Sequence, residues 1–182
     1  MRQVLFTPFI IIFHTYGYSQ LSSKRTDRAK YVDSMAYYMD SIGNYPSAIS
    51  YYTQSIQLHS SKSIYDVIRR GMSYNSRAAD KKNLQDYRGA IADYTILISI
   101  SPKNDEAFFE RGICKSRLND PEGAIKDFNA VIRLDPKNNI AYLNRGISRL
   151  ALKQKESACL DFSKAGELGY DQAYEMINKY CN

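Results

Sequence analysis

Short segments of the chain recur at a fixed spacing, and this repetition limits the possible folds more than any other feature of the sequence. The string ERGICKS at residue 110 returns as NRGISRL at 144, and YRGAIADYTILI at 87 returns as PEGAIKDFNAVI at 121. Gly112 and Gly146 are 34 residues apart, and so are Ala90 and Ala124. Two kinds of segment alternate, and within each of them apolar or small residues fall three and four apart, which is helical spacing. Each unit is therefore predicted to be a helix hairpin that buries its apolar face by stacking on its neighbours.

The pattern resembles the tetratricopeptide repeat (TPR) family, whose unit of about 34 residues carries small residues near its eighth and twentieth positions, an aromatic at the twenty-fourth and a proline near its end. Pro102 and Pro136 fit the last of these features. The resemblance implies an all-α fold, a right-handed superhelical solenoid of four TPR hairpins with a C-terminal capping helix. The aligned positions are, in repeat order, Ala36, Gly71, Gly112 and Gly146 at the eighth; Ala48, Ala90, Ala124 and Ala158 at the twentieth; Tyr52, Tyr94, Phe128 and Phe162 at the twenty-fourth.

Repeat two is longer than the others. Gly71 and Ala90 are 19 residues apart where the other repeats have 12 between the corresponding positions. Such an insertion of about seven residues is close to two helical turns, so we expect a longer first helix or a protruding loop at residues 76–86. The expected layout is a signal peptide at 1–19, a polar, flexible lead-in at 20–28, repeats at 29–62, 63–103, 104–138 and 139–170, and a capping helix at 171–182.

The first twenty residues have the three-part layout of a secretory signal. One basic residue precedes an apolar run from Val4 to Phe13, and small residues follow at Gly17 and Ser19. This order predicts cleavage between Ser19 and Gln20 and a periplasmic or secreted protein in an oxidising compartment. A buried N-terminal strand or an uncleaved anchor is the alternative.

Arginine and aspartate recur together in three of the four repeats. In repeat one both are absent together, replaced by Met35 and Tyr51. Joint presence and joint loss indicate ion pairs across the two helices of a hairpin, which compensate charges at partly buried positions. A ladder of charges that binds a ligand is the alternative. The predicted structural ion pairs are Arg70 with Asp93, Arg111 with Asp127, and Arg145 with Asp161.

Two cysteines are placed symmetrically about an expected helix turn. Cys159 lies eleven residues before Tyr170 and Cys181 eleven after it. In an antiparallel hairpin such residues stand level, so a disulfide could tie the cap to repeat four. Two reduced, packed thiols are the alternative, and Cys114 is left unpaired.

The sequence contains no catalytic or metal-binding signature. GxSxG, glycine-rich phosphate loops, HExxH and CxxC are all missing, and the chain has only 2 histidines. We therefore expect neither enzymatic activity, nor a cofactor, nor a metal. The net charge of +6 comes largely from Lys and Arg between residues 69 and 88. This surplus favours attraction to acidic proteins or an anionic envelope surface over nucleic-acid binding.

In TPR proteins one stripe of each first helix faces the concave side of the solenoid and binds peptides. Here the resemblance places a largely apolar stripe there, which predicts a groove for an amphipathic helix or an apolar extended segment. Packing between neighbouring helices is the alternative role for some of these residues. The predicted partner-binding residues are Tyr37, Tyr65, Ile68, Met72, Phe109, Ile113, Leu143 and Ile147.

The leading interpretation is thus a non-enzymatic interaction module or scaffold that binds a peptide or protein outside the cytosol. The alternatives are a structural or assembly subunit that associates through its convex face or ends, and a cytosolic co-chaperone adaptor. Family members of the last kind grip acidic peptides with Lys, Arg and Asn at five positions. Those positions hold Asp33, Tyr37, Arg69, Glu106 and Glu110 counted from repeat one, or Ile68, Met72, Glu110, Ile140 and Asn144 counted from repeat two. Neither set forms such a carboxylate clamp.

Overall fold

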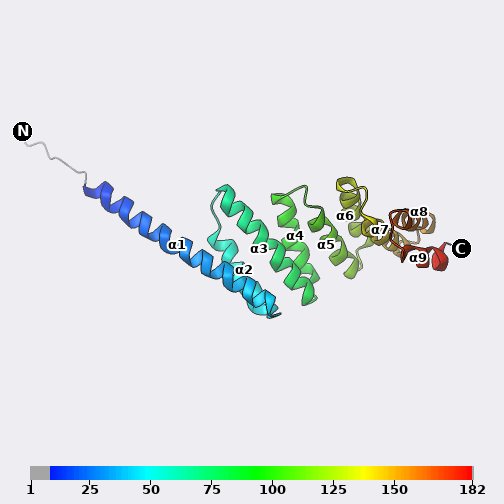
Figure 1. Ribbon diagram of the computed structural model, residues 1–182, viewed down its shortest axis with the longest axis horizontal. Helices are drawn as coiled ribbons and strands as arrows, with labels where there is room; N and C mark the ends of the chain where they lie inside the picture. The colour runs from blue at the N-terminus through cyan, green and yellow to red at the C-terminus, as the bar shows by residue number, and fades with distance from the viewer. Residues whose placement is uncertain (1–8, 182) are drawn as a thin grey trace, which may run out of the picture.

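The computed structural model describes residues 9–181, with side chains described from residue 24 onward. Within these residues every regular element is a helix, and the helices stack in chain order into one elongated body (Figure 1). Residues 1–8 of the predicted signal peptide and residue 182 of the predicted capping segment lie outside the described residues. The helices are α1 (Phe9–Ser41), α2 (Tyr45–Leu58), α3 (Ile64–Asn83), α4 (Tyr87–Ile100), α5 (Asp105–Arg117), α6 (Pro121–Leu134), α7 (Asn139–Ala151), α8 (Lys155–Glu167) and α9 (Ala173–Tyr180).

Consecutive helices pair into the hairpins α1/α2, α3/α4, α5/α6 and α7/α8, each hairpin packs on the next, and α9 covers α8. Short polar side chains explain where most of these helices begin, because each accepts a hydrogen bond from the backbone N–H three residues further on. These N-caps are Asn44, Ser63, Asp86, Asn104, Asp120 and Asn138. The result is the predicted all-α solenoid with a terminal cap.

The first helix begins much earlier than expected. Residues 20–28 are not a flexible lead-in, because they continue α1, which runs without interruption from Phe9 to Ser41. Neither proline nor glycine interrupts residues 20–41, and Ala29 and Val32 are buried. Arg25 also donates to the backbone oxygen of Leu58 at the end of α2. The prediction of a flexible lead-in was therefore wrong, because these contacts stabilise a helix in this segment.

The extra residues of repeat two are the first two turns of α3. This helix has 20 residues, whereas α5 and α7 have 13 each. The small residue that meets α4 is Ala78, which is fully buried and stands 12 positions before Ala90, the spacing found in the other repeats. The assignment of Gly71 to the eighth position was therefore wrong. Of the two forms expected for the insertion, the longer first helix is the one found, and most of residues 76–86 is helix.

The close approach of the two helices explains the glycines of the last two repeats. A Cβ atom on Gly112 would lie 2.9 Å from the Phe128 ring, and one on Gly146 would lie 2.6 Å from the Phe162 ring. A Cβ on Gly71 would meet its nearest neighbour, Leu97, at an ordinary 3.7 Å. Only the first two glycines are required by packing, which is independent support for Ala78 as their counterpart.

Candidate functional site

Buried aspartates bind two cations each inside the hairpins. Arg111 donates to Asp127 through two nitrogens, at 3.0 and 2.7 Å, and Lys115 reaches the same carboxylate at 2.8 Å. In the last hairpin Arg145 donates to Asp161 in the same way, at 3.0 and 2.6 Å, and Arg149 adds a contact at 2.7 Å. The second cation of each cluster was missed by the sequence analysis, although its spacing of 12 residues from the aspartate repeats as regularly as the first.

The predicted pair of Arg70 and Asp93 does not form. Asp93 instead accepts from Arg77 at 2.9 and 2.7 Å and from Lys81 at 2.8 Å. The physical reason is the position of the insertion, because Arg77 and Asp93 are 16 residues apart like the other two pairs. Arg70 lies on the added turns and makes a long contact, 3.4 Å, with the backbone oxygen of His59.

The same arginines also connect successive hairpins. Arg77 donates to Thr53 at 2.8 Å, Arg111 to Thr95 at 3.0 Å, and Arg145 to Asn129 at 2.7 Å. Each guanidinium further lies over an aromatic ring three residues earlier in its helix, at 5.3 to 5.5 Å. The guanidinium groups of these arginines are thus occupied by contacts within the protein. The series of ion pairs is therefore structural, and it offers no free charge to a ligand.

A disulfide joins Cys159 in α8 to Cys181 after α9, with Cα atoms 5.7 Å apart. Cys114 is a free thiol buried in the core, and burial raises its pKa to about 11. A thiol of this kind is poorly nucleophilic at neutral pH. The disulfide therefore ties the cap to the last hairpin, and Cys114 has a packing role.

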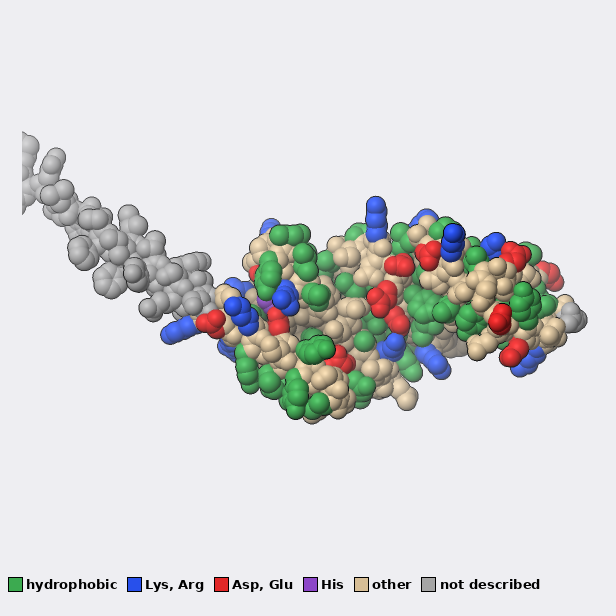
Figure 2. Space-filling view, in the orientation of Figure 1, with side chains coloured by type: hydrophobic (Ala, Val, Ile, Leu, Met, Phe, Trp, Pro, Cys, Tyr) green, Lys and Arg blue, Asp and Glu red, His purple; other side chains and the backbone are tan. Residues whose placement is uncertain are grey.

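The predicted partner-binding residues divide into two groups by exposure. Tyr37, Tyr65, Ile68, Met72 and Ile147 are exposed, whereas Phe109, Ile113 and Leu143 are partly buried. Phe109 contacts Phe128 with ring centroids 5.7 Å apart, so part of its surface belongs to the core. Figure 2 shows hydrophobic side chains gathered at the start of α3 and along the second half of the solenoid.

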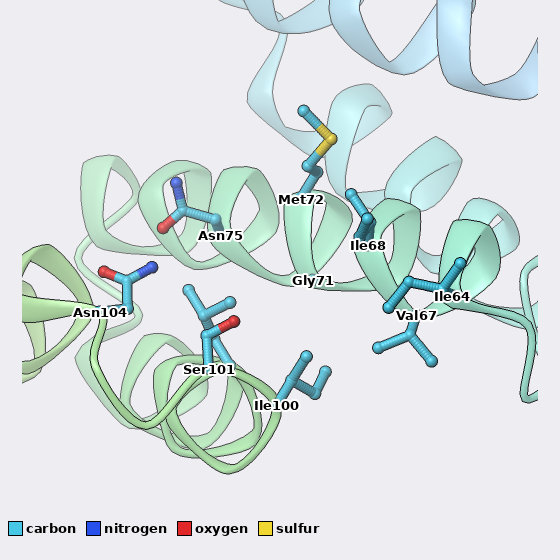
Figure 3. A pocket seen from close by; sticks show the side chains of 10 residues that line it. Ile64, Val67, Ile68, Gly71, Met72, Asn75, Ile100, Ser101 and Asn104 are labelled. Atoms are coloured by element: carbon cyan, nitrogen blue, oxygen red, sulfur yellow. The ribbon is translucent and has the colours of Figure 1, made fainter.

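The added turns of α3 build one wall of a notch that faces the end of α4 and the loop before α5 (Figure 3). Its volume is about 340 Å³, and no charged residue lines it. Asn75 and Asn104 point toward each other at one end, and Ile64, Val67 and Ile68 lie at the other. Sequence analysis missed Ile64, Val67, Asn75 and Asn104, although Ile64 stands four residues before Ile68 on the same helical face. An apolar floor beside two carboxamides suits an uncharged side chain and its main-chain amides.

Charges near the notch do not fit an acidic ligand. Arg77, Lys81 and Lys82 are held by Asp93 and Glu110, with the Lys82 contact at 2.6 Å. Asp105 and Glu106 lie in the first turn of α5, next to Asn104. In the corrected register the clamp positions of repeat two hold Asn75, Ser76 and Ala79 in place of Ile68, Arg69 and Met72, and the cations that a carboxylate clamp needs are again missing.

The part of the chain that the structure describes contains no cluster of three or more His, Cys, Asp or Glu able to hold a metal ion. Nor does any helix among these residues combine the length and the apolar character needed to cross a bilayer. Neither kind of site contributes to the function proposed below.

Comparison with known proteins supports the repeat assignment. A family model described as tetratricopeptide repeat matches residues 105–138, which form the hairpin α5/α6. The chain contains a tetratricopeptide repeat. No curated protein sequence matches it. The matched hairpin holds the Arg111–Asp127 pair.

Solved structures extend the likeness beyond one repeat. The second TPR domain of human RPAP3, in complex with an HSP70 peptide SGPTIEEVD, is 25% identical, with a TM-score of 0.60 over 64% of this chain and 98% of that one. MamA is 16% identical, with a TM-score of 0.70 over 93% of this chain and 99% of that one. A TPR protein from Parabacteroides merdae is 18% identical, with a TM-score of 0.70 over 78% of this chain and 53% of that one. The last two likenesses concern the fold alone.

Proposed function

We propose that this TPR protein is a non-enzymatic interaction module that holds an uncharged, apolar segment of a partner protein outside the cytosol. The observation that carries the proposal is the notch beside α3, where exposed Ile64, Ile68 and Met72 surround an apolar floor. Exposed aliphatic side chains gathered in one hollow mark a binding surface more often than isolated ones do. Peptide binding by the RPAP3 domain supports a protein or peptide as the ligand.

The chemistry of the partner segment follows from the residues that line the notch. Its central anchor would be an aliphatic side chain in the notch, with main-chain amides of the segment bonded to Asn75 and Asn104. Asp105 and Glu106, in the first turn of α5 next to Asn104, would repel an acidic residue of the segment. This preference is opposite to that of the acidic peptide in the RPAP3 complex, whose sequence ends in EEVD. The co-chaperone alternative is therefore the less favoured proposal.

A location outside the cytosol agrees with two features of the chain. The Cys159–Cys181 bond belongs to an oxidising compartment, because cytosolic thiols are normally kept reduced. The first twenty residues also carry the predicted signal sequence. N-terminal sequencing of the protein from its natural source tests this part, with Gln20 as the expected first residue. An intact Met1 in the mature protein would remove the secretion proposal.

A capture experiment tests the binding proposal. Wild-type protein and the variants Ile68→Glu, Ile147→Glu and Leu160→Glu are immobilised and exposed to an extract of the source cell envelope. Leu160 is the matched control, an exposed leucine on the second helix of the last hairpin. We expect Ile68→Glu and Ile147→Glu to lose the partner at unchanged helical circular dichroism, Leu160→Glu to keep it, and added salt to have little effect.

A partner that binds elsewhere would support the alternative, an assembly subunit that associates through its convex face or ends. Tyr31 and Tyr38 in α1 are exposed, although they occupy the positions that Ala107 and Cys114 occupy, fully buried, in the third hairpin. They form an uncovered end of the solenoid. Capture that survives both groove substitutions and fails with Tyr38→Glu would place the contact at this end, and loss at high salt alone would place it on the basic residues near Arg88.

A further inference from the structure

The contact surface between the first hairpin and α3, called the first junction below, contains a buried acid. Asp80 of α3 is 1% exposed, and its Oδ2 has no hydrogen-bond partner among the described residues. The corresponding residues of the next two hairpins are Cys114 and Ser148, which are also buried but carry no ionised group at neutral pH. The first junction is therefore the one where a carboxyl group replaces a small neutral side chain.

The groups around Asp80 favour its protonated form. Asp40 of α1 hydrogen-bonds to it, and the hydroxyl of Tyr52 in α2 donates to Oδ2 of Asp40 at 3.3 Å. Two carboxyl groups can share a hydrogen bond only when one of them carries a proton. The cations within three residues of Asp80 on α3 are paired elsewhere, Arg77 and Lys81 with Asp93 and Lys82 with Glu110. Burial, and then the charge of Asp40, raise the pKa of Asp80 to about 7.

A histidine occupies another part of the same junction. His59, just after α2, is 3% exposed, with Nε2 at 3.0 Å from Oδ2 of Asp33 in α1 and Nδ1 at 2.9 Å from Oδ1 of Asp66 in α3. Only an imidazolium donates from both ring nitrogens, so both bonds form together only in the protonated state. Hydrogen bonds from Ser61 and then from His59 lower the pKa of Asp66, which keeps it ionised. The Tyr65 ring edge and Arg70, which reaches the His59 backbone oxygen, also lie next to it, and Arg25 and Lys30 of α1 line the same pocket.

We propose that the first junction is a pH-dependent latch, which holds α1 and α2 against α3 while Asp80 is protonated and loosens as the pH rises. Deprotonated Asp80 places a second negative charge beside Asp40 in a buried site. The cavity of about 180 Å³ lined by Asp33, Tyr37 and Arg69 lies between α1 and α3, so the latch also sets its width.

The direction and size of the effect follow from linkage. A group whose pKa is higher in the folded state than in the unfolded state stabilises the folded state fully at a pH below the unfolded-state pKa. This stabilisation is lost as the pH rises through the folded-state pKa. For Asp80 that value is about 7. Between pH 6 and pH 8 the opening equilibrium of the junction should therefore rise by about tenfold through this group alone.

Hydrogen–deuterium exchange of the full chain tests the latch without any partner. Protection factors are measured at pH 6 and pH 8, corrected for intrinsic exchange, in residues 29–41 of α1 and, as an internal control, in α7. We expect protection of α1 relative to α7 to fall by about tenfold or more in the wild type. The exposed carboxylate variant Glu122→Gln is the matched control and should behave like the wild type.

Substitutions of Asp80 test whether this residue causes the pH effect on α1. Asp80→Asn keeps the shape of the side chain, and Asp80→Ser copies the residue of the fourth hairpin, Ser148, so that at least one variant should fold. Each should reduce the pH effect on α1 by about tenfold. A reduction of less than about threefold, or a wild-type protein whose α1 protection does not depend on pH, overturns the proposal.

Discussion

Replacing Asp127 by leucine should be among the most damaging single changes in the chain. Its side chain is 4% exposed and binds Arg111 and Lys115 at 2.7 and 2.8 Å. Leucine would leave two cations facing an apolar interior, and breaking a buried pair in this way costs about 3–5 kcal/mol. Arg111→Met should cost less, about 1–3 kcal/mol, because Lys115 continues to neutralise the carboxylate.

Repeat one shows which residues can replace the ion cluster of the third hairpin without burying a charge. Its residues at the three corresponding positions are Met35, Met39 and Tyr51, and Met39 and Tyr51 pack against the apolar core of the first hairpin. The triple variant Arg111→Met, Lys115→Met, Asp127→Tyr should therefore recover most of the loss seen with Asp127→Leu, since no charge remains buried.

Urea unfolding followed by circular dichroism measures these effects, and Lys126→Met, an exposed neighbour of Asp127, serves as the control expected to stay within about 0.5 kcal/mol of wild type. The singles Arg111→Met, Lys115→Met and Asp127→Tyr are measured alongside the triple variant. If the triple variant costs the sum of its three single variants to within about 0.5 kcal/mol, the residues do not act as one cluster and the reasoning fails.

Further expectations concern glycine, the disulfide and the buried acid. Gly146→Ala should destabilise by about 1–3 kcal/mol because of the Phe162 ring, whereas Gly71→Ala should gain about 0.5–1 kcal/mol; thermal unfolding of the pair compares them, and equal shifts would contradict the packing account. Alkylation of the unreduced, denatured protein should label Cys114 only, and labelling of all three thiols would refute the bridge. Cys181→Ser should lower the stability of the last hairpin by about 3 kcal/mol, as the loss of a 22-residue crosslink implies. Asp80→Asn should make global stability less dependent on pH between about 4 and 7, with the wild type losing stability as the pH rises toward the pKa of Asp80, about 7.

The repeat architecture was accessible from the sequence because its determinants are short-range and periodic. Small residues, aromatics and ion pairs keep fixed separations inside a hairpin, so Arg111 and Asp127 could be paired by spacing alone. The same rule failed in repeat two because the Arg-Gly string at 70–71 resembles those at 111–112 and 145–146 more closely than Arg77–Ala78 does. Applying the 16-residue separation as strictly as the string similarity would have selected Arg77.

The binding surface was less predictable for a different physical reason. Seven added residues turn a helix by nearly whole turns, so Tyr65 and Ile68 remain on the face that the wrong register assigned to them. The notch depends on where that helix passes α4 and the loop at Ser101 and Asn104, which is a property of packing and not of periodicity. The contacts of Asp80 and His59 could not be predicted from the sequence for the same reason, because their partners are brought together only by the stacking of the helices.

The bond between Cys159 and Cys181 also defines how the chain would carry a mechanical load. Cys159 lies in the first half of α8, and Cys181 follows the last turn of α9. Tension applied beyond Cys181 passes through the sulfur atoms directly into the early part of α8, so the rest of α8, the turn and α9 form a closed loop that bears none of it. Pulled from that side, the TPR protein would resist at the α7/α8 contact, with its cap still folded.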